Sequence, residues 1–518
     1  MQRRSRKGCI DCKKAKVKCD EERPTCGTCK RRGYACQGYA APVPSTARDR
    51  RETSGEEDER LSTPQDEIVE ANELTLEDSD VLPSDMDYTE QQITIIARAR
   101  ADSMQLPSCP PIYPTVPDIP PDAIGRTDKP GVEIYFNRHP SELVISKEFV
   151  NEMNANVLQV FNQDPAAVAE TLSAIGHIYL GEGGQSIVPV LDRKQRILAR
   201  LRDRRDLEQM MIMLLGLCAL ELIDGRSEPA DTSLPAILSN AAIIIKHQQE
   251  NGLSFSSVAK YFIRALARQD MMVSLTYARH PLIPHSVWLS EDSYRHADRF
   301  MGFTGTLMPI LADLGALAEE MRGGTPTPFS ASDGANRNGS HVGDEVWSEE
   351  AIMITTNPTL AIYQKVLDIR QRLHQWRPVA AQNVPFQASR NLLFHAHAHR
   401  AAALLYLHRL LEPPGSSEAA DQVALGMAHE VMMHLSAMKD QLKTSLWPVL
   451  IAGTELTEEG DRGVVLGMFD EIVRQRKTVT ARRTRDFCVQ RVWAARDAGL
   501  VWNWMDLVEI FPGECLPI

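Results

Sequence analysis

Six cysteines stand in a duplicated pattern near the start of the chain, and this repeat constrains the fold more than any other feature of the sequence. The spacing C-x2-C-x6-C occurs twice, separated by a six-residue connector, at Cys9, Cys12, Cys19, Cys26, Cys29 and Cys36. Few sizeable apolar residues lie between the first and last of them, so hydrophobic burial cannot hold the segment. Chains below about 40 residues seldom fold without disulfides or metal.

Disulfides would be the first alternative if the chain were secreted. The basic residues 1–7 include no apolar stretch typical of a secretory signal, and the remaining cysteines are scattered singly, at Cys109, Cys218, Cys488 and Cys515. A thioredoxin-like C-x-x-C site is a second alternative, but no strand is predicted before it and the motif occurs twice. The spacing therefore indicates a metal site. One tetrahedral zinc would leave two thiolates idle, whereas two zincs require that two of the six thiolates bridge.

The pattern C-x2-C-x6-C-x6-C-x2-C-x6-C, with lysines after the second cysteine and Pro24 before the fourth, resembles the fungal binuclear Zn2Cys6 transcription factors. The resemblance covers about residues 6–38. It implies two Zn²⁺ ions per chain, with Cys9 and Cys26 bridging them. Cys12 and Cys19 would complete one site, and Cys29 and Cys36 the other.

Basic residues follow both C-x2-C turns, each of which can start a short helix. They are Lys13, Lys14, Lys16 and Lys18 after the first turn, and Lys30, Arg31 and Arg32 after the second. In a chain of net charge -12, this concentration of positive charge predicts binding to the phosphates of double-stranded DNA. A lysine can also donate to guanine O6 and N7 in the major groove.

The resemblance gives the base-reading role, for CGG-like triplets, to the lysine three residues before the third cysteine, which is Lys16. The family often carries Arg or Lys just before that lysine, whereas this chain has Ala15. We expect the missing charge to weaken phosphate anchoring or to alter the reading of the triplet, without affecting the fold.

Residues 41–128 are rich in Pro, Ser, Asp and Glu, which predicts a disordered acidic linker. Two interpretations stay open for it: a plain solvated linker, or an activation segment that folds on a coregulator. No sustained heptad follows the cysteines, so a coiled-coil dimer is not expected there. A homodimer, if formed, is expected to use the helical domain.

Residues 129–518 are predicted to form a large all-helical domain, because apolar residues recur there at helical spacing. Helices are expected around residues 210–223 and 261–275, and from residue 390 to the prolines Pro413 and Pro414. The apolar run 210–223 is shorter than a bilayer span of about 20 residues, so no membrane association is expected. An irregular insert, residues 322–345, is predicted to be a mobile surface loop.

Four segments of this region resemble blocks of the C-terminal fungal-specific transcription factor domain. They are "MGFTGTLMPIL" (301–311), "HRAAALLYLHRLL" (399–411), "LWPVLIAGTEL" (446–456) and "VWAARD" (492–497). The resemblance implies an all-helical regulatory domain.

An enzymatic function is not predicted. The best candidates for a second metal site are His395, His397, His399 and His408, but the glutamate of an H-E-x-x-H motif is absent, and Ala396 and Ala398 offer no base. Core histidines are the better interpretation. The sequence thus predicts a nuclear, zinc-dependent, sequence-specific DNA-binding regulator of RNA polymerase II genes. The alternative is a ligand-binding sensor or scaffold that attaches to DNA only non-specifically.

Overall fold

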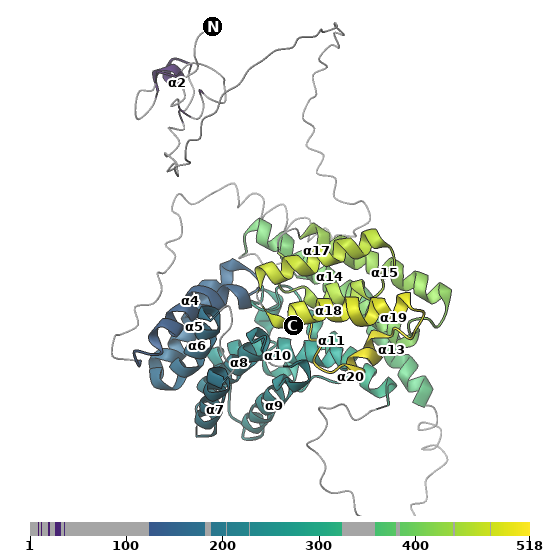
Figure 1. Cartoon of the computed structure of the whole chain (residues 1–518), viewed down its shortest axis with the longest axis horizontal. Coiled ribbons are helices and arrows are strands. Elements are labelled where there is room, and N and C mark those ends of the chain that lie inside the picture. The colour runs from purple at the N-terminus through teal and green to yellow at the C-terminus, as the bar shows by residue number, and fades with distance from the viewer. Residues whose placement is uncertain are drawn as a thin grey trace, which may run out of the picture. The chain divides into compact units, whose positions relative to one another are not determined.

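The structure of the chain is a computed structural model. It describes residues 9, 12, 19–20, 26–32, 36, 124–181, 188–203, 205–226, 228–323, 358–379, 384–438, 441–476 and 478–518. Contacts divide the chain into two units, Met1–Ser84 and Asp85–Ile518. Across the described ranges every regular element is helical (Figure 1), which confirms the mainly α class. The domain boundaries near residues 40 and 128 stay predictions.

The described part of the first unit contains one short helix, α2 (Gly27–Arg31). The second unit is built mostly from longer helices. In chain order they are α4 (Lys129–Leu143), α5 (Val150–Gln163), α6 (Pro165–Leu180), α7 (Val188–Arg202), α8 (Leu207–Ile223), α9 (Leu234–Glu250), α10 (Ser257–Thr276), α11 (Met308–Met321), α13 (Pro358–Gln375), α14 (Phe386–Leu411), α15 (Glu418–Ala437), α16 (Leu446–Gly453), α17 (Glu459–Gln475), α18 (Val479–Phe487), α19 (Ala494–Asp497) and α20 (Trp504–Ile510).

Shorter elements join these helices. The 3-10 turns are η1 (Lys147–Phe149), η2 (Pro229–Asp231), η3 (His285–Val287), η4 (Glu291–Tyr294) and η5 (Gly305–Leu307). A π-helical segment, η6 (Cys488–Trp493), lies between α18 and α19. The helix expected from the apolar run 210–223 is confirmed as α8, and the two expected from periodicity are confirmed as α10 and α14. Helix α14 ends at Leu411, just before the two prolines.

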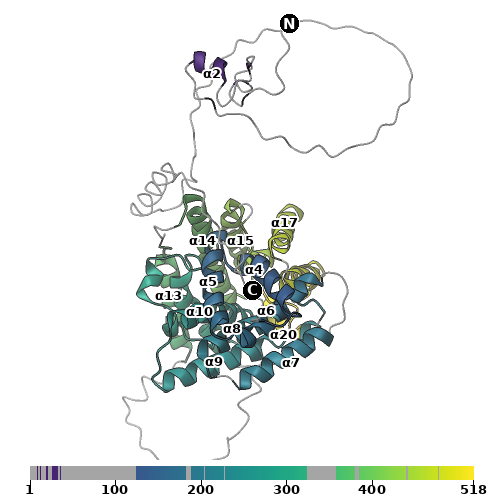
Figure 2. The same cartoon turned by 90° about the vertical axis from the view of Figure 1, so that its left-hand side faces the viewer.

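Helix α8 is the central element of the first half of the helical unit. It lies between α6 and α10 in both views (Figures 1 and 2) and also contacts α7, α9 and α18. A helix that is apolar on all sides must be buried, and α8 is buried along almost its whole length. Among the described residues, no helix is both long and apolar enough to span a bilayer.

Helices α4 and α6 cross at two glycines. A Cβ atom added to Gly176 would lie 1.8 Å from the carbonyl oxygen of Gly131. The backbones therefore approach more closely here than any side chain would permit.

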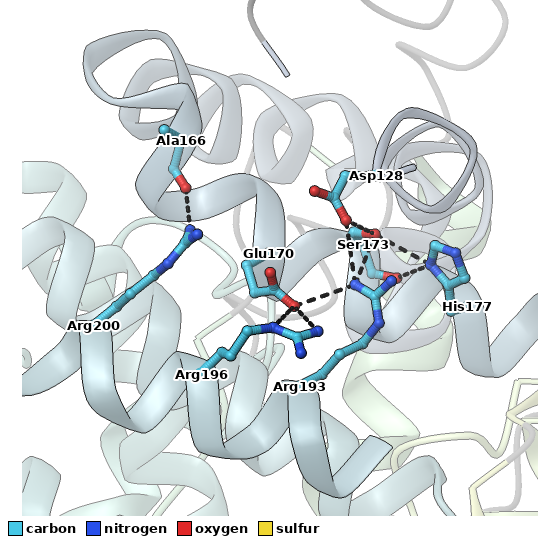
Figure 3. A network of polar contacts seen from close by, with 8 residues as sticks. All are labelled: Asp128, Ala166, Glu170, Ser173, His177, Arg193, Arg196 and Arg200. Carbon is cyan, nitrogen blue, oxygen red and sulfur yellow. Dashed lines mark hydrogen bonds and ion pairs between the residues drawn. The ribbon is translucent and has the colours of Figure 1, made fainter. Parts of the chain in front are cut away.

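A polar network fastens α7 to α6 (Figure 3). The carboxylate of Glu170 on α6 accepts hydrogen bonds from Arg193 Nη1 at 3.3 Å and from Arg196 Nη2 at 3.0 Å. Arg193 Nη1 also donates to the carboxylate of Asp128, just before α4, at 3.3 Å. Ser173 Oγ donates to that Asp128 carboxylate at 3.0 Å. Arg193 and Arg196 of α7 thus join α7 to α6 and to the N-cap of α4.

The second half of the unit is organised around α16. Every residue of this short helix is buried, and it contacts α14, α15, α17 and α18. Helices α14 and α15 are joined by a short turn and pack along each other. At the end of α11, Arg322 Nη2 forms ion pairs with Asp506 at 2.8 Å and Glu509 at 3.0 Å. Residues 324–357 lie outside the described residues, so the predicted mobility of the insert stays a prediction.

Candidate metal centre

The six cysteines of the duplicated motif come together in the first unit. Their sulfur atoms form two groups of four, each with all members within 4.8 Å of one another. One group is Cys9, Cys12, Cys19 and Cys26, and the other is Cys9, Cys26, Cys29 and Cys36. The two groups share Cys9 and Cys26, the residues expected to bridge two metals.

The sulfur separations fit tetrahedral zinc. A Zn–S bond of about 2.3 Å implies that sulfurs on one tetrahedral ion lie about 3.8 Å apart. The Sγ atom of Cys9 is 3.5 Å from that of Cys26 and 3.7 Å from that of Cys29, and the Cys12 and Cys26 sulfurs are 3.6 Å apart. Cys12 and Cys29, one from each group, are also close, at 3.8 Å. This all-thiolate donor set is the kind that selects Zn²⁺ over harder ions.

Both C-x2-C turns have the same local hydrogen bond. The backbone N–H of Cys12 donates to Cys9 Sγ at 3.4 Å, and that of Cys29 donates to Cys26 Sγ at 3.3 Å. In the second turn Cys26 is the N-cap of α2, so one side chain both caps the helix and faces the cluster. The sequence duplication is therefore accompanied by the same cysteine N–H to sulfur hydrogen bond in both repeats.

Burial favours the protonated thiol until a metal binds. Desolvation raises the pKa of Cys9, and it raises the pKa of Cys12 to about 12. Hydrogen bonding to Cys26 and burial together raise the pKa of Cys29. A bound dication reverses this preference, because it holds the thiolate form. Zinc binding by these residues must therefore release protons.

Asp20 is a feature of the site that sequence reasoning missed. It follows Cys19, and its carboxylate accepts hydrogen bonds from the Gly27 N–H at 2.9 Å and from Thr28 Oγ1 at 3.2 Å. It also lies 3.3 Å from Arg31 Nη2. The one hint in the sequence was an acidic residue within a strongly basic stretch. Its partners lie seven to eleven residues away, and no spacing rule predicts such contacts.

The basic residues of the motif are described only in its second half. Lys30 and Arg31 lie on α2, Arg32 is its C-cap, and all three side chains are exposed. The predicted DNA-binding residues Lys13, Lys14, Lys16 and Lys18 lie outside the described residues. Their contacts with DNA stay predictions.

The histidines weighed as a second metal site lie on α14. His395, His397 and His399 are buried, as expected for core histidines. The rings of His395 and His399 have centroids 4.1 Å apart, and His399 Nδ1 is 2.9 Å from the His395 carbonyl oxygen. His408 is partly buried, with Nε2 3.0 Å from the carbonyl oxygen of Ala420. Among the described residues, only cysteines form groups able to hold a metal ion.

Two protein families match the chain. The fungal Zn(2)-Cys(6) binuclear cluster domain matches residues 7–45, and the fungal specific transcription factor domain matches residues 162–512, which is more than half of the chain. The first of these domains binds zinc, in agreement with the clustered cysteines.

Two curated proteins are similar over 39 residues, or 8% of this chain. They are White-opaque regulator 2 of Candida albicans, 49% identical, and the aspercryptin biosynthesis cluster-specific transcription regulator atnN of Emericella nidulans, 56% identical. The similar region covers 9% and 6% of these relatives, respectively. No solved structure matches the chain.

Proposed function

Because this chain belongs to the family with the fungal specific transcription factor domain and carries the zinc cluster of fungal transcription regulators, we propose that it reads CGG-like DNA triplets and regulates RNA polymerase II genes. Families of this kind are transcription factors and not enzymes. Both similar curated proteins are named as regulators.

The observation that supports DNA reading most directly is the shared pair of cysteines. Two four-thiolate groups joined at Cys9 and Cys26 would hold the two halves of the module against each other once zinc is bound. A rigid module of this size presents its helices to a DNA groove in a constant orientation. The exposed Lys30 and Arg31 on α2 supply phosphate contacts, and Lys16 is the proposed base reader.

Selection of binding sites from random duplexes tests this proposal. Base readout by Lys16 should enrich a CGG-like triplet, because each good contact to a guanine discriminates by about 1–3 kcal/mol. Phosphate contacts alone enrich no sequence. Binding without enrichment would instead favour the second candidate, a sensor or scaffold that attaches to DNA non-specifically.

Location and partners belong to the same proposal. A DNA-binding regulator acts in the nucleus and recruits coregulators, and residues 41–128 offer acidic sequence for such contacts. One module reads about three base pairs, too few to select a genomic site, so a second module is needed. We propose a homodimer formed by the helical domain. Sedimentation of residues 1–125 and 129–518 separately tests it, and a dimer confined to residues 1–125 would contradict it.

A further inference from the structure

Asp20 connects the two halves of the zinc module. It directly follows Cys19, which belongs to the first four-thiolate group, and its carboxylate binds residues that follow Cys26 in the second half. Oδ1 accepts from the Gly27 N–H at 2.9 Å, and Oδ2 accepts from Thr28 Oγ1 at 3.2 Å. These bonds hold the first turn of α2 against the end of the first half.

The same carboxylate also contacts Arg31 and favours one direction of its side chain. The Nη2 atom of Arg31 lies 3.3 Å from Asp20 Oδ2, while the Arg31 side chain is 74% exposed and that of Asp20 is 24% exposed. An exposed ion pair contributes little to folding stability, so stabilisation does not account for this contact. Its physical effect is to restrict the rotamers of a long side chain on the surface of the module.

A restricted arginine is better prepared to bind an anion. A guanidinium has five N–H donors, so the bond to Asp20 leaves donors for a phosphate. Ordering the side chain in advance reduces the entropy lost on binding. The carboxylate charge itself repels DNA, so the benefit must come from orientation.

We propose that Asp20 is a positioning residue that holds α2 and Arg31 where Arg31 contacts the DNA backbone. This inference rests on the proposed DNA-binding function. It assigns to an acidic residue a role that strengthens binding to a polyanion, which is the opposite of what its charge alone predicts.

The test uses the full chain and the duplex enriched by site selection, with dissociation constants measured over a range of salt concentrations. Arg31→Ala should lower the magnitude of the salt slope by about 0.9 and the affinity about fivefold near 0.15 M salt, as expected for one lost phosphate contact. Asp20→Ala should also weaken binding, by less than Arg31→Ala and without reducing the salt slope, because Arg31 can still reach a phosphate but must first be ordered. The double variant should bind no more weakly than Arg31→Ala, because without Arg31 there is no side chain left for Asp20 to orient.

Glu21→Ala is the matched control, since it removes the same charge at the next position. It should leave the affinity unchanged or strengthen it. Asp20→Asn keeps an acceptor for the Gly27 N–H but loses the ion pair with Arg31, and it should still weaken binding without reducing the salt slope. Zinc content, measured by native mass spectrometry, should be unchanged in every variant.

Tighter binding by Asp20→Ala and Asp20→Asn, like that of Glu21→Ala, would overturn the inference. So would additive losses in the double variant, or loss of zinc from Asp20→Asn. Failure of the proposed function is seen separately, as absence of sequence enrichment by the unmodified chain.

Discussion

Arg409 and Glu455 form a bidentate ion pair in the core of the helical unit, 46 residues apart in the chain. Nε donates to Oε1 at 3.0 Å and Nη2 to Oε2 at 2.5 Å, and each side chain is only 1% exposed. Arg496 Nη1 donates to the carbonyl oxygen of Glu455 at 2.7 Å. Three of the four segments that resemble family blocks, 399–411, 446–456 and 492–497, therefore meet at this one pair.

Breaking this pair should destabilise the helical unit strongly. Arg409→Met leaves the Glu455 carboxylate buried and unpaired, which should reduce the free energy of unfolding by about 3–5 kcal/mol. Adding Glu455→Leu should recover much of that loss, because the buried stranded charge is then gone. Asp421, which lies 2.7 Å from Arg409 Nη1 and is 24% exposed, is then left without this partner. Lys365→Ala, which breaks the exposed pair with Glu320, should cost less than about 1 kcal/mol. Urea unfolding of the full chain, followed by circular dichroism, measures all three, and equal losses for Arg409→Met and Lys365→Ala would contradict the prediction.

The shared cysteines should be distinguishable from the others by zinc count. The unmodified chain should carry two zincs, and a chelator should unfold the zinc module, since metal binding supplies most of its folding free energy, on the order of 10 kcal/mol per site. Cys26→Ala removes a ligand from both groups and should lose both ions. Cys36→Ala affects only the second group and should retain one. Native mass spectrometry gives the counts, and the same loss from both variants would argue against bridging.

Lys16 and Lys13 should make different kinds of contact with DNA, Lys16 with a base and Lys13 with a phosphate. Lys16→Ala should weaken binding to the selected site by about 1–3 kcal/mol and binding to random DNA much less, because it removes a base contact. Lys13→Ala should weaken both similarly and reduce the salt slope. Dissociation constants on both duplexes decide this, and equal losses for Lys16→Ala would mean that it contacts only phosphate.

The helical unit should lose stability as the pH falls below the ordinary pKa of histidine. Burial lowers the folded-state pKa of five histidines, to about 3 for His139 and His397, to about 4 for His399 and His434, and well below the usual value for His395. The unfolded chain therefore binds more protons. The contribution of these buried histidines to the free energy of unfolding is complete above about pH 6.5. Below that pH it decreases by up to about 1.4 kcal/mol per pH unit for each histidine.

Urea unfolding between about pH 7.5 and about pH 5 measures this dependence. The double variant His397→Gln/His434→Gln removes a ring pair whose centroids are 5.4 Å apart, and it should flatten the dependence. His374→Gln, at an exposed position on α13, should leave it unchanged. A pH dependence that is the same in both variants would show that these buried rings do not control acid stability.

The zinc centre and the principal helices followed from the sequence because their determinants are local. The C-x2-C spacing sets the ligand turns, and the two backbone N–H bonds to Cys9 and Cys26 lie within those turns. The continuous apolar run 210–223 predicted α8, periodic apolar residues predicted α10, and Pro413 marked the end of α14 because proline cannot continue a helix. Each of these features needs information from only a few neighbouring residues.

The tertiary structure alone decided which polar groups meet. Arg409 with Glu455, Glu170 with Arg196, and Asp20 with Gly27 are pairs that no spacing rule connects. An ion pair or a helix cap depends on where the fold brings two distant segments together, and many acids and bases of this chain would satisfy the same chemistry. The sequence thus determined the zinc ligands and the helical class, whereas long-range packing determined which polar side chains pair with one another.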